Sequence, residues 1–331
     1  MTDDLPPFLG HLIGSFAVLL LQLGRQTGLL DAVLAGGGTP AEVAQRAGVD
    51  ERNAAEWLRG MTAAGYLAHD DGRFAATELT SMTFSPGFPI SANAVLDGLW
   101  AAPAVYDDVV AAIRSGAGIA SERLTPYAPF VGVSTPTYEQ AFVADWVASV
   151  PGLTERLEAG ARVAEIAPGN GAAAAVLGRA FPASTVVGYD LSPKEPVDLP
   201  PNVTLRQGDA RALPDDGPFD LVYCFDSLHH MSDPGDVLAG VRRVVAPGGD
   251  LMLAETDLTG DLDQDVHDPS SVISYTSSVV YCLQEALQGG GEVHSCAEGV
   301  RWVEDALAAA GFRDIGVHHS ETGNAIVTGR A

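Results

Sequence analysis

Apolar side chains recur every three to four positions from residue 8 to residue 35, the spacing of one face of an amphipathic helix. The tetrapeptide at 39–42, Thr-Pro-Ala-Glu, predicts a second helix over about 40–47, because a capping threonine precedes a first-turn proline and a glutamate. Asp50 is the expected cap of a third helix over 53–64, and a turn at 69–72 separates two short strands. Three helices and a β-hairpin predict a winged helix over residues 1–85.

The pattern over residues 86–155 predicts a mostly helical linker. A helical stretch at 95–113 contains Pro103, which is expected to kink or split it. Residues 121–134 are expected to be irregular, and a further helix is predicted over 138–150.

From residue 163 onward, short apolar runs alternate with turns and helical segments. A strand at 163–167, a Pro-Gly-Asn-Gly turn and an Ala-rich helix at 171–181 lead to a second strand that ends in Asp190. Gly169 and Gly171 allow backbone angles closed to other residues and let a ligand approach closely. Ala174 stands where the dinucleotide fingerprint has its third glycine, so the turn favours a nucleoside with a small tail over a pyrophosphate.

The rest of the chain continues this α/β alternation. Four prolines within 191–201 predict that a helix between the second and third strands is lost or reduced to a loop. Asp233-Pro234 is expected to cap and start a helix that runs to about residue 245. The remaining predictions are strands at 202–205, 220–224 and 251–254, a long insertion at 256–298, a helix at 301–310 and a closing antiparallel hairpin at 315–318 and 324–328.

The order of the motifs resembles the class I S-adenosylmethionine-dependent methyltransferases over about residues 155–331. The motifs are Glu165-x-Ala167-x-Gly169-x-Gly171, Asp190, Gly208-Asp209-Ala210, Phe219-Asp220-Leu221-Val222 and the following segments 219–234 and 238–255. The resemblance implies an α/β fold with a Rossmann-like seven-stranded catalytic domain at 156–331, preceded by a mostly helical winged-helix domain. It also implies S-adenosylmethionine as the cofactor and methyl transfer to a small molecule, with oxygen, nitrogen and carbon acceptors left open.

The resemblance assigns cofactor contacts residue by residue. It implies that Glu165, Gly169 and Gly171 hold the amino-acid tail, although Glu165 would alternatively brace the glycine turn. It further implies that Asp190 holds the ribose hydroxyls and Leu191 packs on adenine. The remaining cofactor-binding predictions are Asp209 for the adenine amino group, with Ala210 beside it, and Phe225 after the fourth strand.

His229 and His230 follow the fourth strand, where ligands bind in open α/β sheets, and are the candidate catalytic residues. A base is needed only for a weakly acidic acceptor, so a direct role for either histidine is a hypothesis. An alternative is a metal-assisted C-methyltransferase of an α-keto acid, as in some relatives. In it His294 would join His229 and His230, with Asp226 or Asp268 as carboxylate ligand. No residue is assigned as a metal ligand outside this alternative.

The relatives cover the catalytic pocket with the segment that corresponds to 86–155. Four aromatic residues of this chain are therefore candidates to face the substrate, namely Tyr127, Phe130, Tyr138 and Phe142. The simpler interpretation, favoured for any one of them, is that they belong to the core.

Charge argues against a nucleic-acid partner. The 331 residues carry 18 basic and 43 acidic side chains, a net charge of −25, whereas binding to a phosphate backbone requires clustered Lys and Arg. The alternative for the winged helix is a dimerisation module, because it resembles the N-terminal domain that precedes the catalytic domain in many small-molecule methyltransferases. A ligand-sensing transcriptional regulator with a degenerate methyltransferase domain is the runner-up.

The remaining composition indicates a reducing compartment. Cys224, Cys282 and Cys296 have neither a disulfide nor a zinc spacing. The acidic N-terminus has no basic region of a secretory signal, and the apolar run Phe16–Leu23 is too short to span a bilayer. A cytoplasmic homodimer without a membrane or nucleic-acid partner, working in specialised metabolism, is the resulting expectation.

Overall fold

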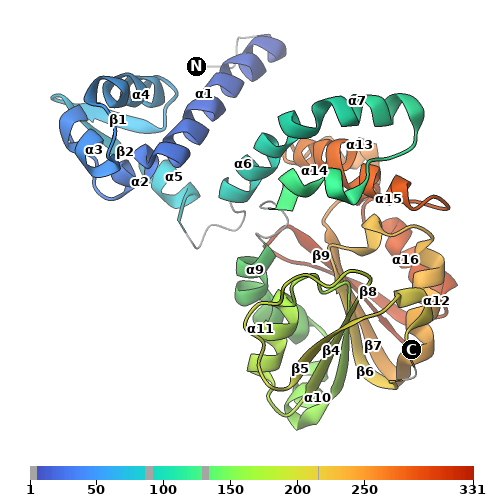
Figure 1. The fold of residues 1–331 in the computed structure, drawn as a ribbon. Helices are drawn as coiled ribbons and strands as arrows, with labels where there is room; N and C mark the ends of the chain where they lie inside the picture. Colours follow the sequence, from blue (N-terminus) through green and yellow to red (C-terminus); the bar gives the residue numbers. More distant parts are fainter. Residues whose placement is uncertain (1–5, 86–91, 129–133, 215) are drawn as a thin grey trace. The chain divides into compact units, whose positions relative to one another are not determined.

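The computed structural model describes residues 6–85, 92–128, 134–214 and 216–331. Contacts divide the chain into two compact units, Met1–Asp97 and Gly98–Ala331, which are described separately (Figure 1). The expected division into 1–85, 86–155 and 156–331 stays a prediction.

The first unit is a helical domain with a small β-hairpin. The side chain of Thr39 accepts a hydrogen bond from the backbone of Glu42, whose carboxylate accepts one from Thr39, so the predicted capping box is present. Asp50 caps the next helix through the backbone N–H of Asn53. The elements are α1 (Pro7–Thr27), α2 (Leu29–Leu34), α3 (Pro40–Ala47), α4 (Glu51–Ala63), β1 (Leu67–Asp70), β2 (Arg73–Ala76) and α5 (Glu78–Thr83).

Only the C-terminal part of α1 joins the core of this unit. The indole Nε1 of Trp57 donates to the carbonyl of Leu20 at 2.8 Å, and a Cβ on Gly24 would lie 2.3 Å from the same ring. Toward the other end, Phe8 and Phe16 are 75% and 61% exposed. By length and composition, α1 is the one helix among the described residues that would be able to cross a membrane. The expectation drawn from Phe16–Leu23 was therefore wrong about length, because the helix extends over 21 residues.

The second unit is built on one seven-stranded sheet with the order β5-β4-β3-β6-β7-β9-β8. The first five strands in this order are parallel, whereas β9 is antiparallel to both β7 and β8. This confirms the predicted Rossmann-like sheet and its closing hairpin. The strands are β3 (Arg162–Ile166), β4 (Thr185–Asp190), β5 (Val203–Gln207), β6 (Phe219–Phe225), β7 (Val245–Thr256), β8 (Arg313–His319) and β9 (Asn324–Arg330).

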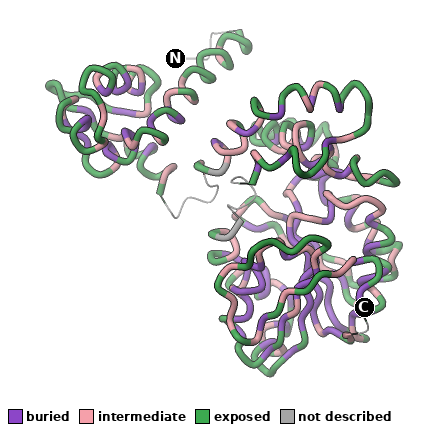
Figure 2. The backbone as a smooth tube through the Cα atoms, in the orientation of Figure 1, coloured by how far each residue is buried: buried purple, intermediate pink, exposed green. Residues whose placement is uncertain are grey.

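Two core clusters cover the two faces of this sheet (Figures 1 and 2). One face packs against α12 (Pro234–Val244) and α16 (Arg301–Ala309), and the other against α10 (Leu153–Gly160), α11 (Ala172–Ala180) and η4 (Tyr138–Val147). Residues 191–200 form no helix, as their prolines predict. Asp233 was wrongly predicted as a side-chain cap. Its φ is 51°, and its carboxylate accepts from the backbone N–H of Glu292 instead.

A third cluster joins the chain after residue 98 to the insertion. Pro103 lies in a short 3₁₀ turn, η1 (Ala102–Val105), which splits the predicted helix into α6 (Ala92–Ala101) and α7 (Tyr106–Ser115). The ring of Tyr127 stacks on Tyr281 at 4.9 Å between centroids. The insertion supplies α13 (Leu262–Asp265), α14 (Ser271–Ser277), the π-helix η7 (Ser278–Cys282) and α15 (Leu283–Gln288).

Candidate active site

The two glycines of the turn between β3 and α11 have different surroundings. Gly169 has a φ of 57°, and a Cβ built on it meets no atom within 4 Å. Gly171 has a φ of 79°, and a Cβ there would lie 2.9 Å from a methyl group of Leu205. Gly171 is therefore needed for packing, whereas the backbone of Gly169 faces free space that a ligand can enter.

Asp190, the last residue of β4, holds the glycine turn in place. Its two carboxylate oxygens accept from the backbone N–H groups of Gly169 at 3.0 Å and Ser192 at 2.8 Å. The next residue, Leu191, leaves 62% of its surface exposed. An acid at the end of the second strand, an exposed apolar side chain and the open turn fit a nucleoside with a polar tail.

Glu165 is buried in β3. It accepts a hydrogen bond from the hydroxyl of Tyr223 at 3.0 Å. Burial raises the pKa of Glu165 to about 8, against the opposing effect of the bonds from Tyr223 and the Ala174 backbone. The bond from Ala174 ties Glu165 to α11, which fits the bracing alternative, and its contact with a cofactor tail stays a prediction.

Asp209 follows β5 at the same edge of the sheet. Its carboxylate pairs with the guanidinium of Arg211 at 2.9 Å, and the hydrogen bond from Arg211 lowers the pKa of Asp209. An adenine amino group would have to share this carboxylate with Arg211. Ala210 is buried, and Phe225 is packed edge-on against Phe142 with a centroid distance of 4.7 Å, so little of either is free for a ligand.

The helical turn η6 (Leu228–His230) places two histidines after β6. His229 is 3% exposed, and its Nδ1 contacts the carboxylate of Glu255 at the end of β7. Burial lowers the pKa of His229, but the attraction of Glu255 and its hydrogen bond outweigh this and raise the pKa to about 9. Glu255 was not predicted. The only signal available was an acid at the end of an apolar strand.

His230 lies beside His229, with ring centroids 4.3 Å apart. Burial and the neighbouring His229 lower the pKa of His230, and its Nδ1 lies 2.8 Å from the carboxylate of Glu285. Asp226 has a φ of 47° and accepts from the side chain of Asn324 at 3.2 Å. Burial and the charge of Glu255 raise the pKa of Asp226 to about 7.

The metal set proposed for C-methylation does not assemble in the described part of the chain. His294 is bonded to Glu298 at 2.7 Å and stacks on Trp302, and Asp268 accepts from the backbone of Ser270. Among the described residues, the side chains close enough to share one ion are instead His229, Cys282 and Cys296. The expectation was wrong because the insertion brings Cys282 and Cys296, and not His294, close to His229.

Three of the four aromatic residues expected over the pocket are described. Tyr127 and Phe142 are buried in the core, and Tyr138 lies against Phe225 with ring centroids 5.8 Å apart. Phe130 lies outside the described residues.

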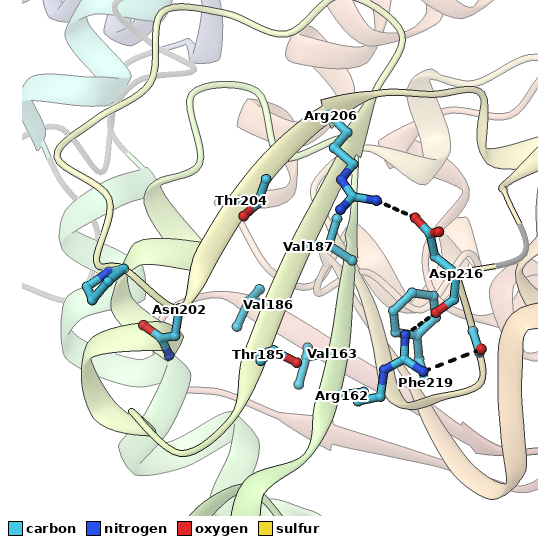
Figure 3. A pocket seen from close by; sticks show the side chains of 12 residues that line it. Arg162, Val163, Thr185, Val186, Val187, Asn202, Thr204, Arg206, Asp216 and Phe219 are labelled. Carbon is cyan, nitrogen blue, oxygen red and sulfur yellow. Dashed lines mark hydrogen bonds and ion pairs between the residues drawn. The ribbon is translucent and has the colours of Figure 1, made fainter.

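A hollow of about 540 Å³ on the described surface lies away from these residues (Figure 3). Its lining includes the first residues of β3, β4 and β6, and Arg206 pairs with Asp216 at 2.5 Å on its wall. Ligands bind at the carboxyl ends of parallel strands, where Asp190 and His229 are found. The hollow is therefore not the candidate active site.

Comparison with known families supports both parts of the architecture. A model described as "Methyltransferase domain" matches residues 164–253, and one described as "Rv2258c-like winged HTH domain" matches residues 15–77. The 27-O-demethylrifamycin SV methyltransferase of Amycolatopsis mediterranei is 29% identical over 195 residues, which cover 52% of this chain and 71% of that protein.

Solved structures show the same fold over the whole chain. An O-methyltransferase-like protein from Nostoc punctiforme has a TM-score of 0.73 at 15% identity and covers 98% of both chains. Human N-acetylserotonin methyltransferase, solved with its cofactor, has a TM-score of 0.66 at 18% identity and covers 100% of this chain and 99% of its own. At these identities the likeness shows the fold alone.

Proposed function

We propose that this chain, a class I S-adenosylmethionine-dependent methyltransferase with an N-terminal winged-helix domain, methylates a hydroxyl oxygen of a small molecule of specialised metabolism. The observation that carries the choice of oxygen is the buried pair of His229, which follows β6, and Glu255, at the end of the neighbouring parallel strand β7. A hydroxyl is a weak acid, so its methylation requires a group that takes its proton. The rifamycin relative agrees with this choice, because its name, 27-O-demethylrifamycin SV methyltransferase, describes a substrate that lacks a methyl group on an oxygen.

The glycine turn and Asp190 would bind the cofactor. Asp190 would accept from the ribose hydroxyls, Leu191 would pack on adenine, and the tail would occupy the space in front of Gly169. When bound, S-adenosylmethionine supplies a methyl group already activated by its positive sulfur. The chain therefore has to position the acceptor and remove its proton.

His229 would take that proton at Nε2. Its Nδ1 is held by Glu255, which fixes the ring orientation and makes the imidazole a stronger base. Because the pKa of His229 is raised to about 9, the ring is charged at neutral pH and becomes able to accept a proton as the pH rises. A positioned base contributes about 10²–10⁴-fold to a rate.

The regulator alternative has no support from the arginines of the first unit. Arg52 and Arg59 both pair with Glu56, at 2.6 and 3.2 Å, and Arg73 pairs with Glu42. A helix whose basic groups are already neutralised is poorly suited to a phosphate backbone. The C-methylation alternative has lost its expected ligands and is not proposed.

The exposed apolar face of α1 would be covered by a second copy of the chain. A membrane is the other candidate, but Arg25 in the last turn is ion-paired with Asp97 at 3.1 Å and Gln22 is buried in the core. These contacts fix the C-terminal turns of α1 within the winged helix. We therefore propose a homodimer that works in the cytoplasm.

An acceptor screen tests the choice of oxygen. Labelled S-adenosylmethionine would be offered with panels of phenols and alcohols, amines and active methylene compounds. Transfer to a hydroxyl compound, reduced about 10²-fold or more in His229→Gln, is the expected result. Transfer confined to nitrogen or carbon acceptors, or full activity of His229→Gln, would contradict the proposal.

A further inference from the structure

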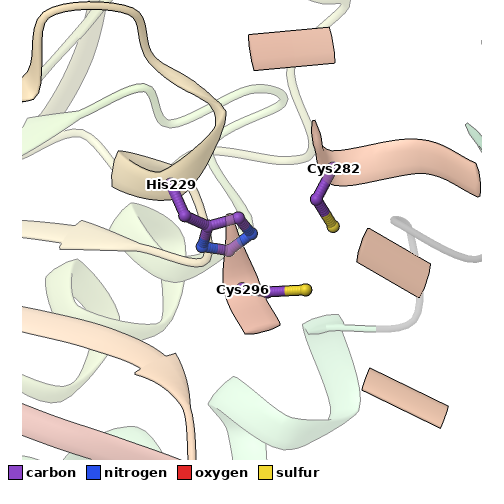
Figure 4. A group of neighbouring side chains, drawn as sticks. All are labelled: His229, Cys282 and Cys296. Atoms are coloured by element: carbon purple, nitrogen blue, oxygen red, sulfur yellow. The ribbon is translucent and has the colours of Figure 1, made fainter. Parts of the chain in front are cut away.

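Two buried cysteines of the insertion face the candidate catalytic histidine (Figure 4). One ligand atom from each of His229, Cys282 and Cys296 lies within 4.8 Å of the other two. Each of these three residues is at most 6% exposed. Cys282 ends the π-helix η7, and Cys296 begins η8 (Cys296–Glu298). Residues far apart in sequence thus present two thiols and an imidazole to one point.

The orientation of the imidazole suits a metal ligand. Its Nδ1 contacts Glu255, and Figure 4 shows the other ring nitrogen, Nε2, directed toward the two sulfur atoms. A carboxylate behind the histidine, with the opposite nitrogen free, is the usual arrangement at protein zinc sites because it fixes the ring and raises its basicity.

The spacing also suits a small soft ion. Zinc binds sulfur at about 2.3 Å and nitrogen at about 2.0–2.1 Å, which places neighbouring ligands of a tetrahedral site about 3.5–3.8 Å apart. From their limit of 4.8 Å, the described atoms would have to approach one another by no more than about 1.0–1.3 Å. Two thiolates, one imidazole and one open position form a known catalytic-type zinc coordination.

The surroundings favour a cation. Glu255 keeps one oxygen, Oε1, that is buried and has no hydrogen-bond partner in the described structure. A divalent ion would stabilise the thiolate forms of both cysteines directly and would compensate the charge of this buried carboxylate.

Cys224 shows what an ordinary core cysteine looks like in this chain. It is also buried, but it lies inside β6 within the apolar core cluster of the sheet. It has no place in the group around His229. Burial alone therefore does not distinguish Cys282 and Cys296 from Cys224. What distinguishes them is that both sulfur atoms lie close to a ring nitrogen of His229.

We propose that His229, Cys282 and Cys296 form a binding site for Zn²⁺ or a similar soft divalent ion, with Glu255 as the group that orients His229. The ion and a proton compete for Nε2, so a chain loaded with metal has no free base at this position. On the proposed function, which this consequence rests on, metal would block methyl transfer. The binding itself does not depend on that function.

Cobalt(II) is the probe for the test, because thiolate ligands give it an intense near-ultraviolet charge-transfer band. The full chain, reduced and stripped by chelator, is expected to bind one Co²⁺ with this band and to lose the band when Zn²⁺ is added. Cys282→Ser and Cys296→Ser should each raise the Kd at least tenfold and diminish the band, whereas Cys224→Ala should leave both unchanged. Absence of the band, or an unaltered band in either serine variant, would overturn the site.

Histidine NMR distinguishes the third ligand without any methyl acceptor. The ring of His229, assigned with His229→Gln, should titrate in the stripped chain and cease to titrate once Zn²⁺ is bound. Glu255→Gln should weaken Zn²⁺ binding by about 10–100-fold. An unchanged titration of His229 in the zinc-loaded chain would remove it from the ligand set.

Discussion

At the scale of single residues, the backbone of Ala167 is held in the left-handed region, with a φ of 54°. Its N–H still donates to the carbonyl of Tyr189 at 2.9 Å, so the conformation is part of the link between β3 and β4. The left-handed conformation costs an L-residue with a Cβ about 1–2 kcal/mol, whereas it costs glycine little.

Ala167→Gly is therefore expected to raise the free energy of unfolding by about 1 kcal/mol, since the relief of strain exceeds the greater entropy of glycine in the unfolded chain. Urea denaturation followed by circular dichroism measures the change. Gly171→Ala is the opposite substitution in the same turn and should destabilise the chain, because its φ is 79° and Leu205 occupies the space of the added methyl. A loss of stability in Ala167→Gly would show that the left-handed conformation carries no strain.

Glu255→Gln tests the electrostatic coupling at His229. The substitution removes the attraction that raises the pKa of His229, while burial still lowers it, so the pKa should fall from about 9. The acidic limb of the pH profile of kcat/KM should therefore move to lower pH, with a rate at its plateau reduced about 10²-fold. Profiles measured with the acceptor found in the screen provide the comparison.

Glu285→Gln is the matched control for that substitution, because Glu285 lies beside His230 and not beside His229. Glu285→Gln should leave the acidic limb of the kcat/KM profile at the same pH as in the parent chain. An equal shift in both variants would mean that the limb reports general charge and not the pair of His229 and Glu255.

The site residues that could be predicted from the sequence are those whose relative positions follow from local geometry. Gly169 and Asp190 lie within one strand–turn–helix–strand unit, so their spacing in the sequence was enough to predict that they are close in space. Glu255, Cys282 and Cys296 reach His229 from β7 and the insertion. Their approach depends on how a long segment folds back over the sheet, which no local pattern encodes.

At the scale of elements, α1 has two different halves. Its C-terminal turns pack on Trp57, and its N-terminal turns present exposed apolar side chains. A surface of this kind normally meets another surface in a functional protein.

Phe16→Glu is expected to convert the proposed dimer to a monomer, because it places a charge at the middle of this face. Light scattering after size-exclusion chromatography measures the mass. Gln26→Glu adds the same charge at an exposed position on α1 and should leave the dimer intact. A monomeric parent chain would refute the dimer, and binding of the parent chain to phospholipid vesicles would favour a membrane as the partner of α1.

Element boundaries were predictable where caps and prolines mark them. The helix at 40–47, the break at Pro103 and the loop after Asp190 follow from such signals. The π-helices at 138–147 and 278–282 were not anticipated, because an inserted residue in a helical turn leaves the apolar spacing almost unchanged.

At the scale of the whole molecule, the net charge argues against DNA binding, whereas the winged-helix fold is typical of it. The chain carries −25, yet its first unit has a fold that many DNA-binding proteins share. Three arginines of that unit are already paired with Glu56 or Glu42. Long-range repulsion therefore adds to the lack of free basic groups.

A labelled DNA duplex at low salt should show no change in fluorescence anisotropy at protein concentrations up to about 10 µM, where nonspecific binders are usually detected. Low salt is the most permissive condition, because counterion release is then most favourable. Salt-sensitive binding in this range would return the regulator interpretation to consideration.

The fold itself was predictable at this scale because the motif order is spread over five parallel strands, each confirmed in the sheet order. The expected division into 1–85, 86–155 and 156–331 stays a prediction. Contacts divide the chain near residue 97, inside α6, where the sequence shows no break in helical character.

The most direct test of the account is calorimetric titration of S-adenosylmethionine and S-adenosylhomocysteine into the parent chain, Asp190→Ala and Asp198→Ala. Asp190 holds the glycine turn, whereas Asp198 lies in the following loop with an exposed carboxylate, so the two variants match in chemistry but not in contacts. The account predicts binding by the parent chain and Asp198→Ala, and a loss of about 2 kcal/mol or more in Asp190→Ala. Absence of binding by the parent chain, or equal binding by all three proteins, would contradict a cofactor site at the carboxyl ends of β3 and β4.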